Sequence, residues 1–157
     1  MSLKEQLRKY SVPKTTSYKG LTSIYFYKIL NTIINIGKLS TTKKLILDFG
    51  CGLGTLKQKL PGINVVGYDI VADYSEVSDW QTINFDIFVA NQVFYVFEPE
   101  ELEKLLEQIR ILNPKALLII GTSRKGRASS IRLRCIFSIR GMLIMDTNYI
   151  LSKNIIY

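Results

Sequence analysis

Apolar residues in this chain fall into short continuous runs and helically spaced stripes, which alternate along the sequence. The continuous runs predict strands that are buried on both faces, as in a parallel sheet. Apolar residues three or four positions apart predict helices from about Thr22 to Ile36 and from about Glu98 to Leu112. The predicted strands are Leu45–Asp48, Ile63–Ile70, Phe85–Asn91 and Ala116–Gly121. This alternation predicts an α/β fold with a doubly wound, mostly parallel sheet.

Two segments interrupt this regular pattern. The segment 70–84 is short and polar, and it leaves room for only a short third strand at about Ala72–Val77. Near the carboxyl terminus, Ala128–Ile139 can form a basic helix, and residues 141–157 can form an incomplete antiparallel hairpin or the start of a further helix. An incomplete hairpin would leave Leu117–Ile120 near an exposed sheet edge, which proteins usually pair or cover. A natural truncation, a homodimer or a degenerate non-catalytic domain would each fit this arrangement.

The first predicted strand ends at Asp48 and leads into glycines at alternate positions, Gly50, Gly52 and Gly54. Glycine tolerates positive φ and allows a ligand to approach the backbone closely. Residues 55–60 follow as the first turns of a helix, whose free N–H groups favour an anionic group. Strand, turn and helix together predict a cradle for a small molecule, with Cys51 inside the turn.

The second predicted strand places another acid at its carboxyl end. Asp69 lies 19 positions beyond Gly50, close to the spacing of about 20 at which nucleotide-binding βαβ units place a carboxylate on ribose hydroxyls. A carboxylate at this position can accept two hydrogen bonds from a vicinal diol. Dinucleotide-binding proteins share this feature, so the acid alone does not identify the ligand.

Three details favour S-adenosylmethionine over a dinucleotide. The glycine pattern is G-x-G-x-G, acids are concentrated in the middle of the chain, and Asp48 precedes the turn. A carboxylate there would repel a pyrophosphate but could face an ammonium or sulfonium. Residues 48–54, followed by Asp69, resemble the cofactor site of the class I S-adenosylmethionine-dependent methyltransferases, and the similarity extends from about Lys43 to Gly126. The resemblance implies a Rossmann-like methyltransferase fold with S-adenosyl-L-methionine as cofactor.

Ligands of such sheets bind outside the carboxyl ends of the strands, where Asn91 lies. The predicted cofactor-binding residues are therefore Asp48, Gly50, Cys51, Gly52, Gly54, Asp69 and Asn91. Asn91 is followed by Gln-Val-Phe and not by Pro-Pro and an aromatic residue, which argues against a methylase of nucleic-acid amino groups. Asp73 and Asp79 are candidate partners of the adenine amine. Candidate acceptor-side groups are Tyr18, Asn91, Tyr95 and Glu98.

Composition and charge limit the remaining possibilities. The 157 residues predict one domain, with amino-terminal cap helices in 1–42, a cofactor-binding core in 43–126 and a basic segment in 127–157. The chain has no histidine, which removes the commonest general base and any His-ligated metal, so no catalytic residue is assigned. Cys51 and Cys135 have no metal-type spacing, and we expect reduced thiols. With no apolar span or signal peptide, these features predict a cytoplasmic protein without a metal.

Basic residues flank an acidic middle. Residues 1–47 contain nine Lys or Arg and one acid, whereas residues 48–110 contain four against eleven acids. Residues 111–157 then contain eight basic residues and one acid. These flanks leave open an anionic partner such as nucleic acid, although no basic–aromatic recognition motif accompanies them.

The sequence therefore predicts a methyltransferase with an unidentified acceptor. The alternative is a non-catalytic S-adenosylmethionine-binding or regulatory domain with a degenerate acceptor pocket, and an NAD-linked reductase is a third reading.

Overall fold

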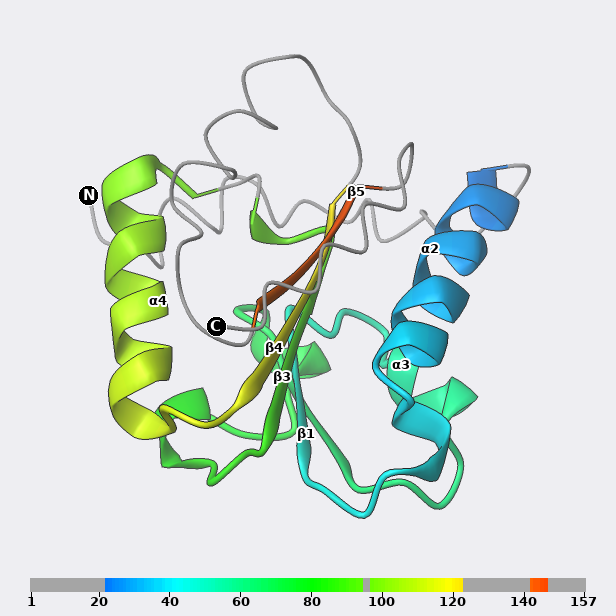
Figure 1. Ribbon diagram of the computed structural model, residues 1–157, viewed down its shortest axis with the longest axis horizontal. Coiled ribbons are helices and arrows are strands. Elements are labelled where there is room, and N and C mark those ends of the chain that lie inside the picture. Colours follow the sequence, from blue (N-terminus) through cyan, green and yellow to red (C-terminus); the bar gives the residue numbers. More distant parts are fainter. Residues whose placement is uncertain (1–21, 95–96, 123–141, 147–157) are drawn as a thin grey trace.

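The computed structural model describes residues 22–94, 97–122 and 142–146 of the chain. Its strands form one sheet in the order β2-β1-β3-β4-β5, and each neighbouring pair is parallel (Figure 1). The strands are β1 (Ile46–Phe49), β2 (Val65–Tyr68), β3 (Ile87–Asn91), β4 (Leu117–Thr122) and β5 (Met142–Asp146). The first four strands agree with the predicted runs: β1 and β4 are shifted by one residue, and β2 and β3 are shorter.

Helices cover both faces of this sheet (Figure 1). Helices α2 (Thr22–Ile36) and α3 (Thr55–Lys59) lie on one face, and α4 (Pro99–Leu112) lies on the other. The predicted doubly wound α/β architecture is therefore confirmed for the described residues. Helix α3 has only five residues, so its dipole provides little of the anion affinity that the sequence predicted.

Strand alternation divides the core into two layers. Side chains next to each other on a strand point to opposite faces, so Ile46 packs with the aliphatic residues under α2 while Leu47 and Phe49 pack under α4. The α4 layer is rich in aromatic rings, with Phe49, Trp80 and Phe88 in mutual contact. This alternation directs the Asp48 side chain toward the α2 and α3 face.

Acidic residues define the start of α4. The Glu98 backbone N–H donates to Oε2 of Glu101 at 3.1 Å, and Pro99 occupies the first helical position. The Glu98 side chain accepts in turn from the Glu101 backbone N–H, and the two bonds form a capping box, which satisfies backbone donors that the helix leaves free. Exposed Glu98, a candidate acceptor-side group, is used here to begin a helix.

The predicted third strand at Ala72–Val77 is wrong. Residues Ala72–Tyr74 form a 3₁₀ helix, and the described residues place no strand on the outer side of β2. Ser75 Oγ accepts from the Asp69 N–H at 3.1 Å and donates to the Val77 carbonyl at 2.6 Å. Such local bonds from side chains to the backbone compete with a strand ladder, so the segment closes on itself beside β2.

The predicted antiparallel hairpin is also wrong where the structure describes it. Strand β5 pairs in parallel with β4, with Leu118 opposite Met142, so β4 lies inside the sheet and not at its edge. A parallel pair requires a crossover of a dozen or more residues, and residues 123–141 provide that length. The predicted helix at 128–139 and the rest of the hairpin lie outside the described residues. Within the described ranges, no helix is both long and apolar enough to span a membrane.

Candidate functional site

The glycine turn after β1 has the backbone shape that its sequence predicted. Gly50, Gly52 and Gly54 have φ angles of 78°, 52° and 69°, all in the left-handed region. At Gly50 an added Cβ would overlap Cγ2 of Val93, whereas at Gly54 it would meet nothing within 4 Å. Gly50 is therefore required by both backbone shape and space, and Gly54 by backbone shape alone.

The turn folds back over the carboxyl end of β2. The backbone N–H groups of Gly50 and Cys51 both donate to the carbonyl oxygen of Tyr68, at 2.7 and 3.0 Å. Since Phe49 pairs with Tyr68 in the sheet, these bonds continue the β1–β2 ladder into the turn. Asp69, the first residue after β2, thus lies directly beside the glycines.

Asp69 points toward the turn and is held there by backbone donors. Its Oδ2 accepts from the Gly52 N–H and its Oδ1 accepts from the Val71 N–H, both at 2.9 Å. A carboxylate has about four lone-pair sites, so each oxygen retains capacity for another donor. The side chain is half-buried, with its orientation fixed before any ligand arrives.

Asp48 lies at the carboxyl end of β1 and is 5% exposed. Burial raises the pKa of Asp48 to about 7, with smaller contributions from the negative charges of Asp69 and Glu76. The carboxylates of Asp69 and Glu76 therefore act on Asp48 from beside the glycine turn. No set of three or more metal-ligating side chains with the geometry to hold an ion occurs in the described part of the chain.

Cys51 contributes its backbone to the turn and directs its thiol elsewhere. The Sγ atom donates to the Tyr74 carbonyl at 3.3 Å and lies where a side chain at Gly67 would have to be. Burial, followed by the charges of Asp48, Asp69 and Glu76, raises the pKa of the Cys51 thiol to about 12. The thiol therefore fastens the 3₁₀ turn at 72–74 to the glycine turn and is not an activated nucleophile.

The carboxyl end of β3 joins the same site. Val93 packs on Gly50, and the Gln92 N–H donates to the Gly121 carbonyl at 2.6 Å. Gln92 has a φ of 60°, an uncommon conformation for a residue with a side chain. Oδ1 of Asn91 lies 2.5 Å from the position of a Cβ added at Gly121. The structure thus brings Val93 against the glycine turn and places Oδ1 of Asn91 beside Gly121 of β4. Gln92 is a residue that no sequence signal indicated.

A hollow of about 400 Å³ adjoins the outer side of the turn. Its walls are the turn and α3 on one side and residues 73–76 on the other, joined by the Lys57 Nζ to Glu76 Oε2 ion pair at 2.7 Å. Asp73 lines this hollow, whereas Asp79 accepts from the Gln81 N–H at 3.0 Å and caps a 3₁₀ helix. Tyr18 and Tyr95 lie outside the described residues.

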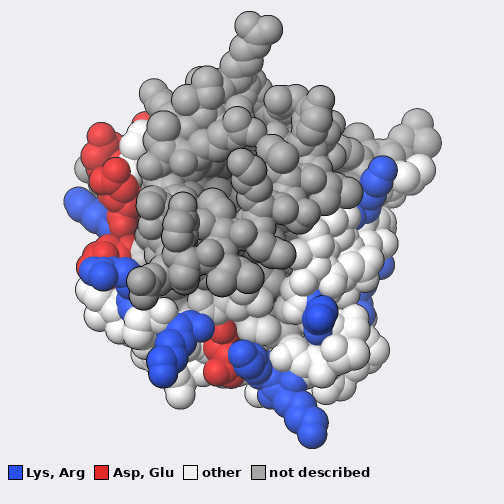
Figure 2. Space-filling model, viewed as in Figure 1, with Lys and Arg blue, Asp and Glu red and all other residues white. Residues whose placement is uncertain are grey.

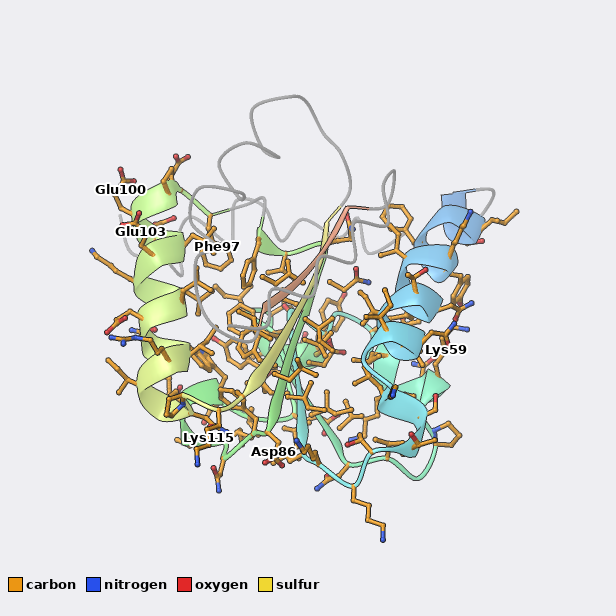
Figure 3. All side chains as sticks on the ribbon, in the orientation of Figure 1. Lys59, Asp86, Phe97, Glu100, Glu103 and Lys115 are labelled. Carbon is orange, nitrogen blue, oxygen red and sulfur yellow. The ribbon has the colours of Figure 1, made fainter. Side chains whose placement is uncertain are left out.

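Charged side chains elsewhere lie away from this site. Figure 2 shows most of the visible acidic side chains along the α4 flank, with basic side chains among them, and further Lys and Arg on the α2 flank and beside an acid at the lower edge. Asp86 and Lys115 lie at the amino end of the strands, and Glu100 and Glu103 on the outside of α4 (Figure 3). These groups do not face the glycine turn.

Comparison with known proteins gives solved structures only. No protein-family model and no curated protein matches this sequence. The magnesium protoporphyrin IX methyltransferase of Synechocystis PCC 6803, solved with bound S-adenosylmethionine, is similar over 87% of this chain and 84% of its own, with TM-score 0.58 and 19% identity. The same enzyme with bound S-adenosylhomocysteine is similar over 92% of this chain and 78% of its own, with TM-score 0.52 and 16% identity.

A third similar structure is the PH0226 protein of Pyrococcus horikoshii OT3, with TM-score 0.53 and 22% identity. The match covers 73% of this chain and 64% of that protein, so this chain spans less than two thirds of its length. At these identities the likeness establishes the fold. The fold is the Rossmann-like α/β fold of these methyltransferase structures, which is the fold that the resemblance in the sequence implied.

Proposed function

We propose that this chain binds S-adenosylmethionine at the carboxyl edge of the sheet, above the 50–54 turn, and transfers its methyl group. The observation that carries this proposal is the Asp69 carboxylate, fixed beside the turn by the Gly52 N–H at 2.9 Å. Its remaining lone pairs suit the two hydroxyl groups of a ribose. The two solved neighbours with bound S-adenosylmethionine or S-adenosylhomocysteine support the same ligand class.

Each cofactor residue has a distinct role in this proposal. Asp69 binds the ribose hydroxyls, and the left-handed glycines keep the turn free of side chains where the ligand passes. Asn91 borders the ligand from the end of β3, and buried Asp48 provides a negative charge for its cationic end. Cys51 takes part only through its backbone, because its thiol bonds Tyr74 on the far side.

Bound S-adenosylmethionine would supply a methyl group already activated by the sulfonium. The chain's own residues then position the ligand and exclude water, which supplies much of the acceleration in an in-line displacement. Nucleic acid as acceptor, a homodimer and a cytoplasmic location stay predictions of the sequence.

One observation favours the alternative, a binding domain without turnover. The predicted third strand is a 3₁₀ turn, so the described residues place no strand on the outer side of β2. Ligand binding is common to both proposals, and only methyl transfer distinguishes them. Transfer of radiolabelled methyl to any member of a panel of small-molecule, protein and nucleic-acid acceptors would exclude the alternative.

The proposed ligand is tested by titration calorimetry with S-adenosylmethionine, S-adenosylhomocysteine and NAD. We expect micromolar binding of the first two, and a loss of at least about 100-fold in Asp69→Ala, because charge-assisted hydrogen bonds contribute roughly 1.5–3 kcal/mol each. Asp86→Ala is the matched control, since Asp86 is an exposed acid at the opposite edge of the sheet (Figure 3). Binding of NAD alone, or an Asp69→Ala protein that melts normally and binds as before, would refute the proposal.

A further inference from the structure

Asp48 is the one charged side chain buried within the described part of the chain. It pairs with Gly67 of β2 and Val89 of β3, and it shares the sheet face of Ile46. It lies two residues before the glycine turn, at the edge of the sheet where ligands of this fold bind. A carboxylate at this depth loses most of its hydration.

No described residue donates a hydrogen bond to the Asp48 carboxylate, although its burial exceeds nine tenths. The titratable groups that act on it are acids: Asp69 after β2, and Glu76 beside α3. Lys57 of α3 pairs with Glu76 at 2.7 Å, and no described cation acts on Asp48. Val89 on β3 is apolar, as is the buried face of α2.

Buried charges in proteins are paired or neutralised. The Cys51 thiol, the other titratable group of the turn, donates to the Tyr74 carbonyl and does not compensate the charge. Asp48 therefore has two ways to avoid an isolated charge: it holds a proton, or it faces a positive group on a bound ligand. The sheet and the turn provide neither a donor nor a cation among the described residues.

Building on the proposed function, we propose that binding of the cationic cofactor displaces a proton from Asp48, whose carboxylate then pairs with a positive group of the ligand. The neutral carboxylic acid loses its proton to solvent, and the ligand's ammonium or sulfonium takes the proton's place as the compensating charge. No other bond forms or breaks. Asp48 is thus a specificity residue that favours cationic over neutral adenosyl ligands, more strongly as the pH rises.

The pKa of Asp48 lies in a range where proton release on ligand binding can be measured. Burial and the two neighbouring acids raise the pKa of Asp48 to about 7, so about half of the protein carries this proton at pH 7 and about nine tenths at pH 6. We expect release of about 0.5 proton per ligand at pH 7.0 and about 0.9 at pH 6.0. The Kd at pH 6.0 should be about fivefold higher than at pH 7.0.

The experiment is titration of the full chain with S-adenosylmethionine at pH 6.0 and 7.0, in two buffers of different ionisation enthalpy at each pH. The difference in observed heat between buffers gives the number of protons released. The chain has no histidine, and the ligand's α-amino group, which titrates near pH 8, accounts for at most about 0.1 proton at pH 7.0 and about 0.01 at pH 6.0. Release with S-adenosylmethionine alone assigns the sulfonium, and release with S-adenosylhomocysteine as well assigns the ammonium.

Two variants complete the test. Asp48→Asn keeps the side-chain volume and should bind without proton release, whereas Glu103→Gln, which removes an exposed acid of α4, should release as many protons as the wild type. Normal binding with no proton release at pH 6.0, or unchanged release in Asp48→Asn, would overturn this inference alone. Absence of S-adenosylmethionine binding at both pH values would instead refute the proposed function. The wild-type proton count decides the matter even if Asp48→Asn does not fold.

Discussion

Oδ2 of Asp69 accepts a hydrogen bond from the backbone N–H of Gly52 at 2.9 Å. This bond joins the end of β2 to the turn that follows β1. The second oxygen of the same carboxylate is held by the Val71 N–H, so the side chain cannot turn away without losing two charge-assisted bonds. The Asp69 carboxylate, the proposed partner of the ribose hydroxyls, is therefore already oriented before a ligand binds. This lowers the entropic cost of binding.

The two outer glycines of the turn should differ in their tolerance of alanine. We expect Gly50→Ala to lower the free energy of unfolding by about 3 kcal/mol, because positive φ costs roughly 1–2 kcal/mol and the Val93 overlap adds roughly 1–3 kcal/mol. Gly54→Ala has the backbone cost alone and should lose about 1 kcal/mol. Urea denaturation measures both values, and equal losses would contradict the proposed contact of Val93 with Gly50.

Asp48 should make the unliganded protein less stable as the pH rises. Its pKa is about 7 in the folded chain and 3.8 ordinarily, so between these values the folded state holds a proton that the unfolded state has lost. The free energy of unfolding therefore falls through this range and levels off above about pH 7. From pH 5.0 to 7.5, wild type should lose about 2–3 kcal/mol relative to Asp48→Asn.

Urea denaturation of the two proteins at both pH values gives this difference, in which shared contributions from the other carboxyl groups cancel. Parallel pH profiles for wild type and Asp48→Asn would show that Asp48 titrates as an ordinary aspartate.

The Cys51 thiol should resist alkylation in the folded protein. Its pKa of about 12 leaves roughly one thiolate in 10,000 at pH 8, against about a quarter for an ordinary cysteine. In a Cys135→Ser background, which isolates Cys51, iodoacetamide should react more than about 1000-fold slower in buffer than in denaturing urea. Mass spectrometry follows the adduct. Rapid stoichiometric labelling at pH 8 without denaturant would contradict the contact between Sγ and the Tyr74 carbonyl.

Local patterns predicted most of the elements. Continuous apolar runs identified β1 to β4 because a strand buried on both faces needs apolar residues on both sides. The stripe from Leu102 to Ile109 identified α4, with Pro99 at its start. These signals depend on residues close together in the chain, and short-range sterics and burial decide them. The exact strand ends differ from the predicted runs by at most two residues, because pairing with the neighbouring strands decides where a strand ends.

The candidate site was predictable where its chemistry depends on residue type. Three alternating glycines predicted a left-handed turn, and the structure has positive φ at each. The spacing to Asp69 predicted an acid beside that turn, and the Gly52 bond places it there. Both signals are properties of one strand–turn–helix–strand unit.

The tertiary structure alone decided what depends on distant parts of the chain. The third strand gave way to a closed turn because Ser75 bonds both ends of its own segment, and β5 joined β4 in parallel through a long crossover. Gln92 adopts a left-handed backbone that is bonded to Gly121, which no local pattern indicates. The sequence by itself determined strands β1 to β4, the glycine turn and its acids, because each is a local property. Only folding determined that Asp48 is buried with no donor among the described residues, because burial is set by every element packed around it.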